Sequence, residues 1–249
     1  MQNITLNLKS DTLLIIPCSG KKQGEGMTLD NYDDVLKEFV APEIYYSIIS
    51  VRKNLLETIK QKQKYVSNKC SKNKNIKYGA DFGLHDLSGK YLPAIDRYTG
   101  KLYSEVPNFS ELIKNGLDSP DKPRIIILSA LYGPLHPLSM IQDYNLKMSD
   151  SPAYQTWKKY FPTFIKQYIQ QNNINKIHLY FGSSTSYFKV AHKAINPMLK
   201  KGLINQAIQF EVEDGNSYHT PINHGLLVFA HYQNENVSGF TKNIKGNLL

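Results

Sequence analysis

Short apolar runs along the chain are typical of strands that are buried on both faces. Four such runs are rich in β-branched or aromatic residues. They are Leu13 to Ile16, Arg124 to Leu128, Ile177 to Phe181 and Leu226 to Ala230. Their lack of alternating polar positions predicts a central sheet whose strands are mainly parallel.

Apolar residues recur at helical spacing between these runs. From Ile44 to Ile59 they are separated by three or four positions, and the same holds from Trp157 to Tyr168. A third helix is predicted from Phe188 to Leu199. Strands that alternate with helices over this length predict a three-layer α/β/α fold, with one domain covering residues 1–249 and ligands bound beyond the carboxyl ends of the strands.

Some segments are expected to lie outside the core. Residues 60–77 contain seven lysines and no acidic residue, which predicts a solvated helix end and a mobile loop. This segment could follow a phosphate backbone, although lysine runs often only increase solubility. The ten residues at each end of the chain are expected to be frayed.

Composition and charge restrict the classes of partner that the sequence predicts. Apolar residues make up 41% of the chain, which is ordinary for a globular protein. Thirty Lys and Arg residues against 21 Asp and Glu residues give a net charge of +9, and this field attracts polyanions such as nucleic acid. Many basic proteins bind no specific anion, so charge needs the support of a site.

The cysteines and the apolar content indicate the compartment. Cys18 and Cys70 form no CxxC pair and are too few for a disulfide framework, which favours a reducing compartment. The first ten residues lack the pattern of a signal peptide, and no apolar run is long enough to cross a membrane. We therefore expect a soluble, cytoplasmic protein that does not bind membranes.

The turn after the first strand suits an anion. Backbone N–H groups, a hydroxyl and ammonium groups would gather there at the carboxyl end of a strand. The residues are Pro17, Cys18, Ser19, Gly20, Lys21 and Lys22. The spacing of a Walker A loop is absent. Cys18 could be a nucleophile, but a role in packing and hydrogen bonding is favoured because no His partner is close in sequence.

A long polar and aromatic loop follows the second strand, from Ser129 to Met148. Tyr132 and Tyr144 could stack on a base, Gln142 could read its edge, and Asp143 could stabilise positive charge. Alternatively, glycine and proline merely shape a rigid crossover, and the tyrosines pack against a helix. Gly133 fits either interpretation.

A third segment, Tyr91 to Tyr103, interleaves aromatic and basic residues in a way that suits nucleic acid. Its candidates are Asp96, Arg97, Tyr98, Gly100 and Tyr103. Elsewhere, His219 and His224 lie near Asn223, where a structural or substrate-contacting role is favoured over metal binding. We predict neither a metal site nor a cofactor.

Two stretches, LSALYGPLHPLSMIQDYNLKM and YLPAIDRYTGKLYSEV, resemble the most recognisable blocks of the YaaA family of peroxide-stress proteins. The PCSGKK turn resembles a sister group within that superfamily and, more distantly, the core of archaeosine synthase. The resemblance implies an α/β fold that binds DNA and has kinship with uracil-DNA-glycosylase-like folds.

Departures from these patterns place the chain at superfamily level. Asp143 stands where YaaA proteins usually have a proline before the tyrosine, and the first strand lacks their SPAK-like turn. Uracil-DNA glycosylases have an Asp in the loop after the first strand. This chain has Cys18, Ser19, Gly20 and Lys21 there.

The leading hypothesis is an enzyme that flips a damaged or modified base out of double-stranded DNA and breaks its N-glycosidic bond. Such an enzyme would serve repair, stress survival or phage defence. Asp143 is the first catalytic candidate and Asp96 the second. The predicted substrate-binding residues are Pro17, Cys18, Ser19, Gly20, Lys21, Lys22, Arg97, Tyr98, Gly100, Tyr103, Ser129, Tyr132, Gly133, Gln142 and Tyr144. The alternatives are a non-catalytic DNA-binding stress protein and an enzyme that modifies nucleosides or tRNA bases.

Overall fold

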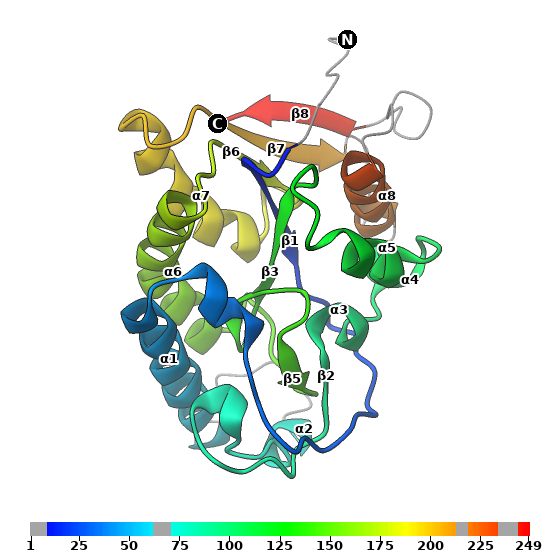
Figure 1. Ribbon diagram of the computed structural model, residues 1–249, viewed down its shortest axis with the longest axis vertical. Coiled ribbons are helices and arrows are strands. Elements are labelled where there is room, and N and C mark those ends of the chain that lie inside the picture. Colours follow the sequence, from blue (N-terminus) through cyan, green and yellow to red (C-terminus); the bar gives the residue numbers. More distant parts are fainter. Residues whose placement is uncertain (1–8, 62–70, 213–218, 234–243) are drawn as a thin grey trace.

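A mostly parallel sheet forms the centre of the computed structural model, which describes residues 9–61, 71–212, 219–233 and 244–249 (Figure 1). Within these residues the sheet has six strands in the order β4-β3-β1-β6-β7-β8. β1, β3, β6 and β7 are parallel, whereas β4 and β8 pair antiparallel at the two edges. The strands span Thr12–Pro17 (β1), Arg124–Ser129 (β3), Gly133–Leu135 (β4), Lys176–Leu179 (β6), Gln206–Val212 (β7) and Ile244–Leu248 (β8).

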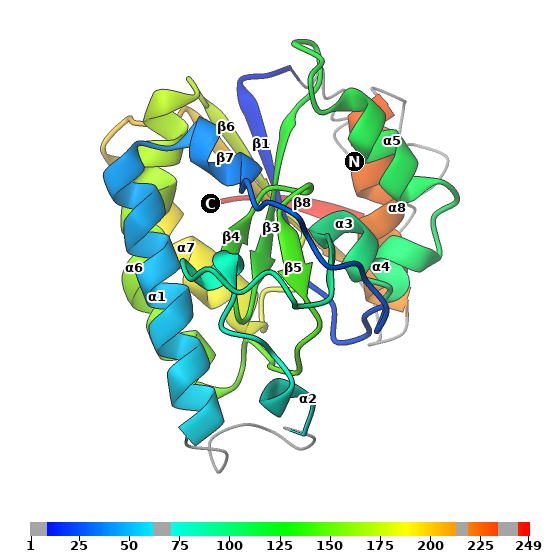
Figure 2. The ribbon, with the colours of Figure 1, turned by 60° about the horizontal axis from the view of Figure 1, so that its bottom comes forward.

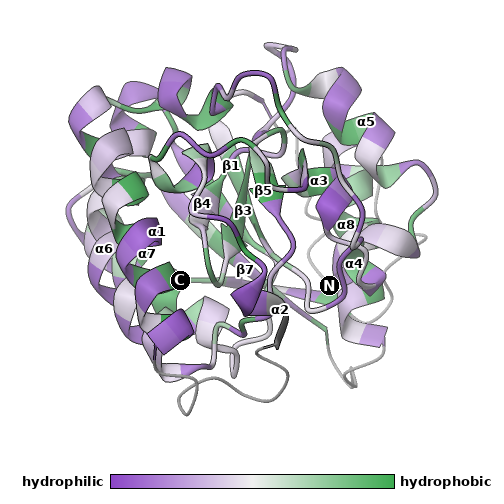
Figure 3. Cartoon of the chain, turned by 90° about the horizontal axis from the view of Figure 1, so that it is seen from below, coloured by the Kyte–Doolittle hydropathy of each residue, from purple (hydrophilic) through white to green (hydrophobic). Residues whose placement is uncertain are grey.

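The middle of the sheet is the hydrophobic core. Leu13 to Ile16 on β1 are completely buried because β3 and β6 pair with both edges of this strand and side chains cover both of its faces. The strands are accordingly hydrophobic in Figure 3, whereas the outer helices alternate between polar and apolar positions. The predicted strands at Leu13, Arg124 and Ile177 are confirmed, the last of them ending at Leu179.

Helices lie on either side of these strands (Figure 2). On one side α1 packs against α6, and α6 against α7. On the other side α8 packs against α4 and α5. The bounds are Pro42–Gln61 (α1), Lys101–Ser104 (α4), Phe109–Gly116 (α5), Ser151–Gln171 (α6), Ser186–Lys200 (α7) and His219–Gln233 (α8). The three helices predicted from apolar spacing correspond to α1, α6 and α7, and the α/β class is confirmed.

Shorter elements connect the larger ones. A second sheet pairs β2 with β5 in antiparallel fashion, and short helical turns surround it. Their bounds are Val35–Phe39 (η1), Ser71–Lys74 (α2), Ala80–Phe82 (η3), Tyr91–Pro93 (β2), Ala94–Arg97 (α3) and Met140–Gln142 (β5).

The fourth predicted strand was wrong. Leu226 to Ala230 lies within α8, and β7 is the fourth parallel strand. A short apolar run without polar interruptions does not distinguish a strand from a buried helix. The run becomes helical because His224, Leu227, Val228 and His231 share the buried side of α8.

The C-terminal end of the chain also differs from the expectation. Ile244 to Leu248 form β8, which pairs with β7, so the last residues are not frayed. Residues 1–8 and 62–70, the middle of the lysine-rich segment, lie outside the described residues. At the border of this segment, Lys60 Nζ donates to Ile76 O at 2.5 Å. In the part of the chain that the structure describes, no helix is long and apolar enough to span a membrane.

Candidate functional site

A cavity of about 540 Å³ lies beyond the carboxyl ends of β1 and β6. From β1 the chain continues to β3 on one side, and from β6 it continues to β7 on the other. The loops after these two neighbouring strands therefore diverge, which leaves a crevice where open α/β sheets bind ligands. The volume lies within the range of small-molecule sites.

Two segments that were predicted from the sequence form one side of the cavity. The first is the turn after β1, and the second runs from Thr99 into α4. The predicted residues that line the cavity are Pro17, Cys18, Ser19, Gly20, Lys21, Gly100 and Tyr103. Thr99, Lys101, Leu102, Ser104 and Glu105 line it as well.

These two segments fit together through their backbones. Thr99 N donates to Lys21 O at 3.0 Å. Gly100 faces Ser19 so closely that a Cβ on Gly100 would lie 2.0 Å from Ser19 Oγ. Ser19 Oγ in turn accepts from Lys21 N at 3.1 Å, which closes the turn. Gly100 is thus required for the close approach of the two walls.

Most of the remaining cavity wall was missed by the sequence analysis. It is formed by the loop after β6 and by the first turns of α8. The residues are Tyr180, Phe181, Gly182, Thr185, Tyr187, Thr220, Pro221 and His224. The loop after β6 carried the same signal as the other two, since Gly182 and Thr185 follow a buried strand. In α8, His224 had been considered for a structural or substrate-contacting role, whereas Thr220 and Pro221 were not singled out.

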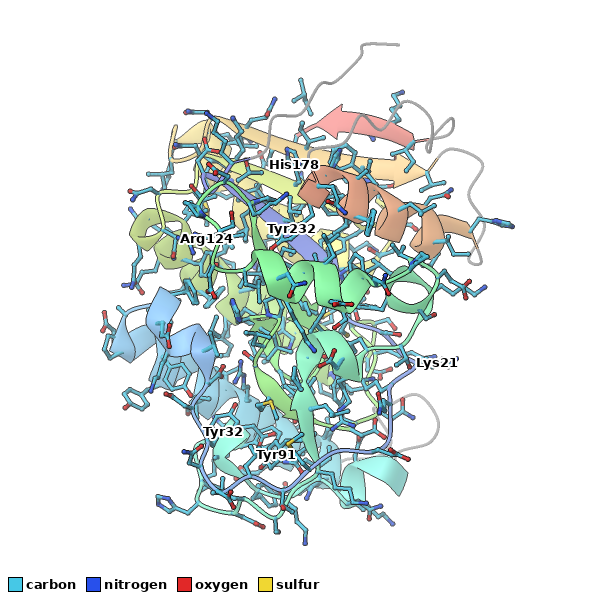
Figure 4. All side chains as sticks on the ribbon, turned by 45° about the vertical axis from the view of Figure 1, so that its right-hand side comes forward. Lys21, Tyr32, Tyr91, Arg124, His178 and Tyr232 are labelled. Carbon is cyan, nitrogen blue, oxygen red and sulfur yellow. The ribbon has the colours of Figure 1, made fainter. Side chains whose placement is uncertain are left out.

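The cavity combines aromatic walls with cationic groups. The rings of Phe181 and Tyr187 are stacked, with centroids 5.8 Å apart and planes at 24°. Lys21 is exposed and stands at the outer edge of the molecule in Figure 4. Lys101 and Glu105 also line the cavity. Such walls can bind a planar aromatic group that carries a negative charge.

Cys18 is held by a network of hydroxyl groups. Its Sγ lies 3.0 Å from the Tyr187 hydroxyl, and the Tyr144 hydroxyl donates to it at 3.4 Å. Tyr144 also hydrogen-bonds to Ser129 Oγ at 2.8 Å and to the Tyr98 hydroxyl at 3.0 Å. Burial raises the pKa of Tyr98, Tyr144 and Tyr187 well above 10. Ser129, Tyr98 and Tyr144 therefore lie behind the cavity wall as neutral hydrogen-bonding groups.

The ammonium group of Lys22 is buried beside this network. It lies 4.0 Å from the centroid of the Tyr144 ring and 5.7 Å from that of Tyr98. These distances are typical of cation–π contacts. Lys22 therefore turns away from its neighbour Lys21, and the lysine pair predicted from the sequence is divided between the tyrosine network and the cavity.

Tyr132 and Gln142 lie in another cluster, around the completely buried Asp81. The Tyr132 hydroxyl donates to Asp81 Oδ2 at 2.7 Å, the Tyr91 hydroxyl donates to Oδ1 at 3.2 Å, and Gln142 Nε2 donates to both oxygens at 3.1 Å. Burial raises the pKa of Asp81 to about 7, and the hydrogen bonds from Tyr132, Gln142 and Tyr91 oppose this rise. This carboxyl was not singled out from the sequence, because its partners are far away along the chain.

Arg97 and Gly133 also lie outside the cavity wall. The buried guanidinium of Arg97 donates to backbone carbonyls, which include Glu25 O at 2.5 Å, Lys90 O at 2.8 Å and Ile141 O at 3.1 Å. It fixes three segments of the chain relative to one another. Gly133 has φ of 66°, and a Cβ there would lie 2.2 Å from the Trp157 ring. Only glycine satisfies both conditions without strain.

Neither catalytic candidate lines the cavity. Asp96 accepts from Ser110 Oγ and forms an ion pair with Lys114. Asp143 lies where its charge acts on Arg97: burial lowers the pKa of Arg97, and Asp143 opposes that effect. Their catalytic roles stay predictions. Among the described residues, no group of three His, Cys, Asp or Glu side chains could hold a metal ion.

Comparison with known proteins places the chain in a family. No curated protein matches it. The family model described as peroxide stress protein YaaA matches residues 13–224, which run from β1 to the first turns of α8. This range contains every residue that lines the cavity. The chain belongs to the YaaA family of peroxide stress proteins.

Proposed function

We propose that this protein binds double-stranded DNA, takes one extruded nucleotide into the cavity, and breaks the N-glycosidic bond of a damaged or modified base. The observation that carries the proposal is the composition of the cavity wall. Aromatic side chains line the same cavity as the turn that carries Lys21, at the carboxyl ends of two parallel strands.

Each part of an extruded nucleotide has a complementary group in the wall. The stacked pair of Phe181 and Tyr187 and the ring of Tyr103 offer apolar surfaces to a base. Lys21 and Lys101 offer positive charge to the phosphate groups that flank it. Extrusion is required because a base inside the duplex cannot reach such a cavity. The net charge of +9 supports binding of the surrounding duplex.

Breaking the N-glycosidic bond places positive charge on the sugar, which a nearby carboxylate stabilises. In the described wall the carboxylate belongs to Glu105, an exposed residue at the end of α4. The proposal therefore assigns this role to Glu105 first, with Asp143 and Asp96 as the candidates from the sequence. Glu105→Gln should lower turnover by roughly a hundredfold while DNA affinity stays similar.

The test is incubation of the protein with duplexes that each carry a different damaged or modified base. Released bases and abasic sites are measured, and Glu105→Gln is compared with Asp143→Asn. Glu43→Gln, on the exposed first turn of α1, serves as the control. Base release that depends on Glu105 supports the proposal. Equal rates for wild type and Glu105→Gln would remove Glu105 from the reaction.

The second candidate function is a stress protein that binds DNA without cleaving it. The observation that favours it is the position of the carboxylates, since Asp96 is paired with Lys114 and neither Asp96 nor Asp143 lines the cavity. Duplex binding together with no base release from any of the modified DNAs would select this function.

We also propose that the protein works in the cytoplasm and consists of a single domain. The proposal treats α1, α6 and α7 as one outer layer and α4, α5 and α8 as the other, which gives a three-layer α/β/α arrangement. The mutual contacts within each group of helices support this view.

A further inference from the structure

His224 borders the cavity from the first turns of α8. It shares this side of the helix with Thr220, which lies one turn earlier and also lines the cavity. The helix approaches α4 closely because the next residue is glycine: a Cβ on Gly225 would lie 2.4 Å from Leu102 O. This close approach fixes the imidazole of His224 between the sheet and the cavity.

One hydrogen bond determines which ring nitrogen of His224 carries the proton. Nε2 lies 2.9 Å from Phe210 O. A carbonyl oxygen only accepts hydrogen bonds, so Nε2 must donate. Burial lowers the pKa of His224 to about 4, so the ring is neutral and has a single proton at neutral pH. Nδ1 is therefore unprotonated and acts as an acceptor.

The second ring nitrogen, Nδ1, has no hydrogen-bond partner among the described residues. The hydrogen bond that anchors the ring to Phe210 O uses Nε2 alone. The side chain of His224 is only 3% exposed and lines the cavity, so the exposed part of its ring faces the cavity. A ligand held there meets a hydrogen-bond acceptor in a fixed orientation.

Three other polar side chains of the wall, those of Ser19, Tyr103 and Thr185, hydrogen-bond within the protein. Ser19 Oγ accepts from Lys21 N, and the Tyr103 hydroxyl donates to Pro17 O at 2.6 Å. Thr185 Oγ1 accepts from Phe188 N at 3.2 Å and donates to Gly182 O at 2.8 Å. These bonds hold the walls in place. The structural bond of His224 uses Nε2 and leaves Nδ1 for a ligand.

We propose that His224 reads the base in the cavity, with Nδ1 accepting a hydrogen bond from an N–H group of that base. The inference rests on the proposed function and adds the chemistry of the substrate to it. The selected bases carry a donor on the edge that faces α8, either a ring imide or an exocyclic amine. A base that presents only acceptors on this edge would leave Nδ1 buried against another lone pair.

The test compares nucleotides that differ only in this donor. Thymidine monophosphate is paired with its imide N-methylated form, and deoxyadenosine monophosphate with its form in which the amino group is doubly methylated. Affinities are measured by calorimetry for wild type, His224→Gln and the control His192→Gln, which changes a histidine of α7 away from the cavity. In His224→Gln the amide nitrogen can still donate to Phe210 O, while the amide oxygen is bonded to Cδ and does not occupy the position of Nδ1, which is bonded to Cγ.

Wild type and His192→Gln should prefer the unmethylated nucleotide of one pair by roughly tenfold or more. His224→Gln should lose that preference and bind the methylated form about as well as wild type does. Which pair shows the preference identifies the donor as imide or amine. Binding without preference in either pair would overturn the role of His224 and leave the proposed function intact. No binding of any nucleotide or of duplex DNA would overturn both.

A second measurement needs no variant. Nitrogen-15 NMR of the histidine rings in the folded wild-type protein reports the tautomer of each imidazole. His224 should have a protonated Nε2 and an unprotonated Nδ1, and the Nδ1 resonance should shift when the preferred nucleotide is added. A protonated Nδ1 at neutral pH would overturn the inference even if His224→Gln failed to fold.

Discussion

His178 offers a quantitative test of the structure, because both of its ring nitrogens are buried with no hydrogen-bond partner among the described residues. The ring lies on β6 against Phe210 and His231, at centroid distances of 5.4 and 5.9 Å. Burial lowers its pKa from an ordinary 6.5 to about 4. Folding therefore keeps His178 neutral. Below about pH 6.5 the unfolded chain takes up a proton that the folded protein does not, so the folded state loses stability. The loss is complete near pH 4, where the folded protein also binds the proton.

The magnitude follows from the size of this shift. At about pH 5 the unfolded chain binds the proton and the folded protein does not, so His178 costs about 2 kcal/mol relative to neutral pH. His178→Phe removes the titrating group, keeps a planar ring of slightly larger size between its neighbours, and breaks no hydrogen bond among the described residues. At neutral pH the variant should be more stable than wild type by about 1–3 kcal/mol, because an unpartnered polar group is gone.

Urea denaturation of wild type and His178→Phe at about pH 7 and about pH 5 measures this effect. The stability advantage of the variant should be about 2 kcal/mol larger at the lower pH. The buried His224 and His231, and Asp81 with its raised pKa, titrate in both proteins, so their contributions cancel. The control His85→Gln changes an exposed residue and should follow wild type. An advantage that is the same at both pH values would refute the burial of a neutral His178.

Three further predictions concern residues around the site. Tyr132→Phe should lower stability by about 1–3 kcal/mol, since Asp81 loses a donor, without changing DNA affinity; urea denaturation and DNA titration measure the two effects. Gly100→Ala should displace Ser19 and weaken nucleotide binding at least several-fold by calorimetry, whereas Gly24→Ala, where a Cβ meets nothing within 4 Å, should be neutral. Cys18→Ser should keep substantial activity, because a hydroxyl can replace the contact with Tyr187. A trapped thiol adduct, with no activity left in the folded variant, would contradict this last expectation.

Periodicity predicted the elements whose burial follows from local pattern. β1, β3 and α1 were found because uninterrupted apolar runs and helical spacing are properties of adjacent positions. The run at Leu226 was misassigned because strand and buried helix produce the same pattern over five residues. The contacts of α8 with α4 and α5 favour the helix. The local sequence carries no information about these contacts.

The candidate site was predicted on one side and missed on the other. The rule that ligands bind beyond strand ends located Ser19 and, through the neighbouring segment, Tyr103. It was not applied to the loop after β6. Tyr132 and Gln142 have the same residue types as a base pocket, but they point to Asp81, a partner about fifty to sixty positions away. Residue type alone does not reveal that direction.

Photocrosslinking of a duplex that carries one iodouracil tests the central claim most directly, because this base reacts with aromatic side chains that stack on it. The crosslinked peptide is identified by mass spectrometry. The account predicts attachment at Phe181, Tyr187 or Tyr103, in the wall of the cavity. Attachment only at residues outside the cavity, from a duplex that binds the protein, would contradict it.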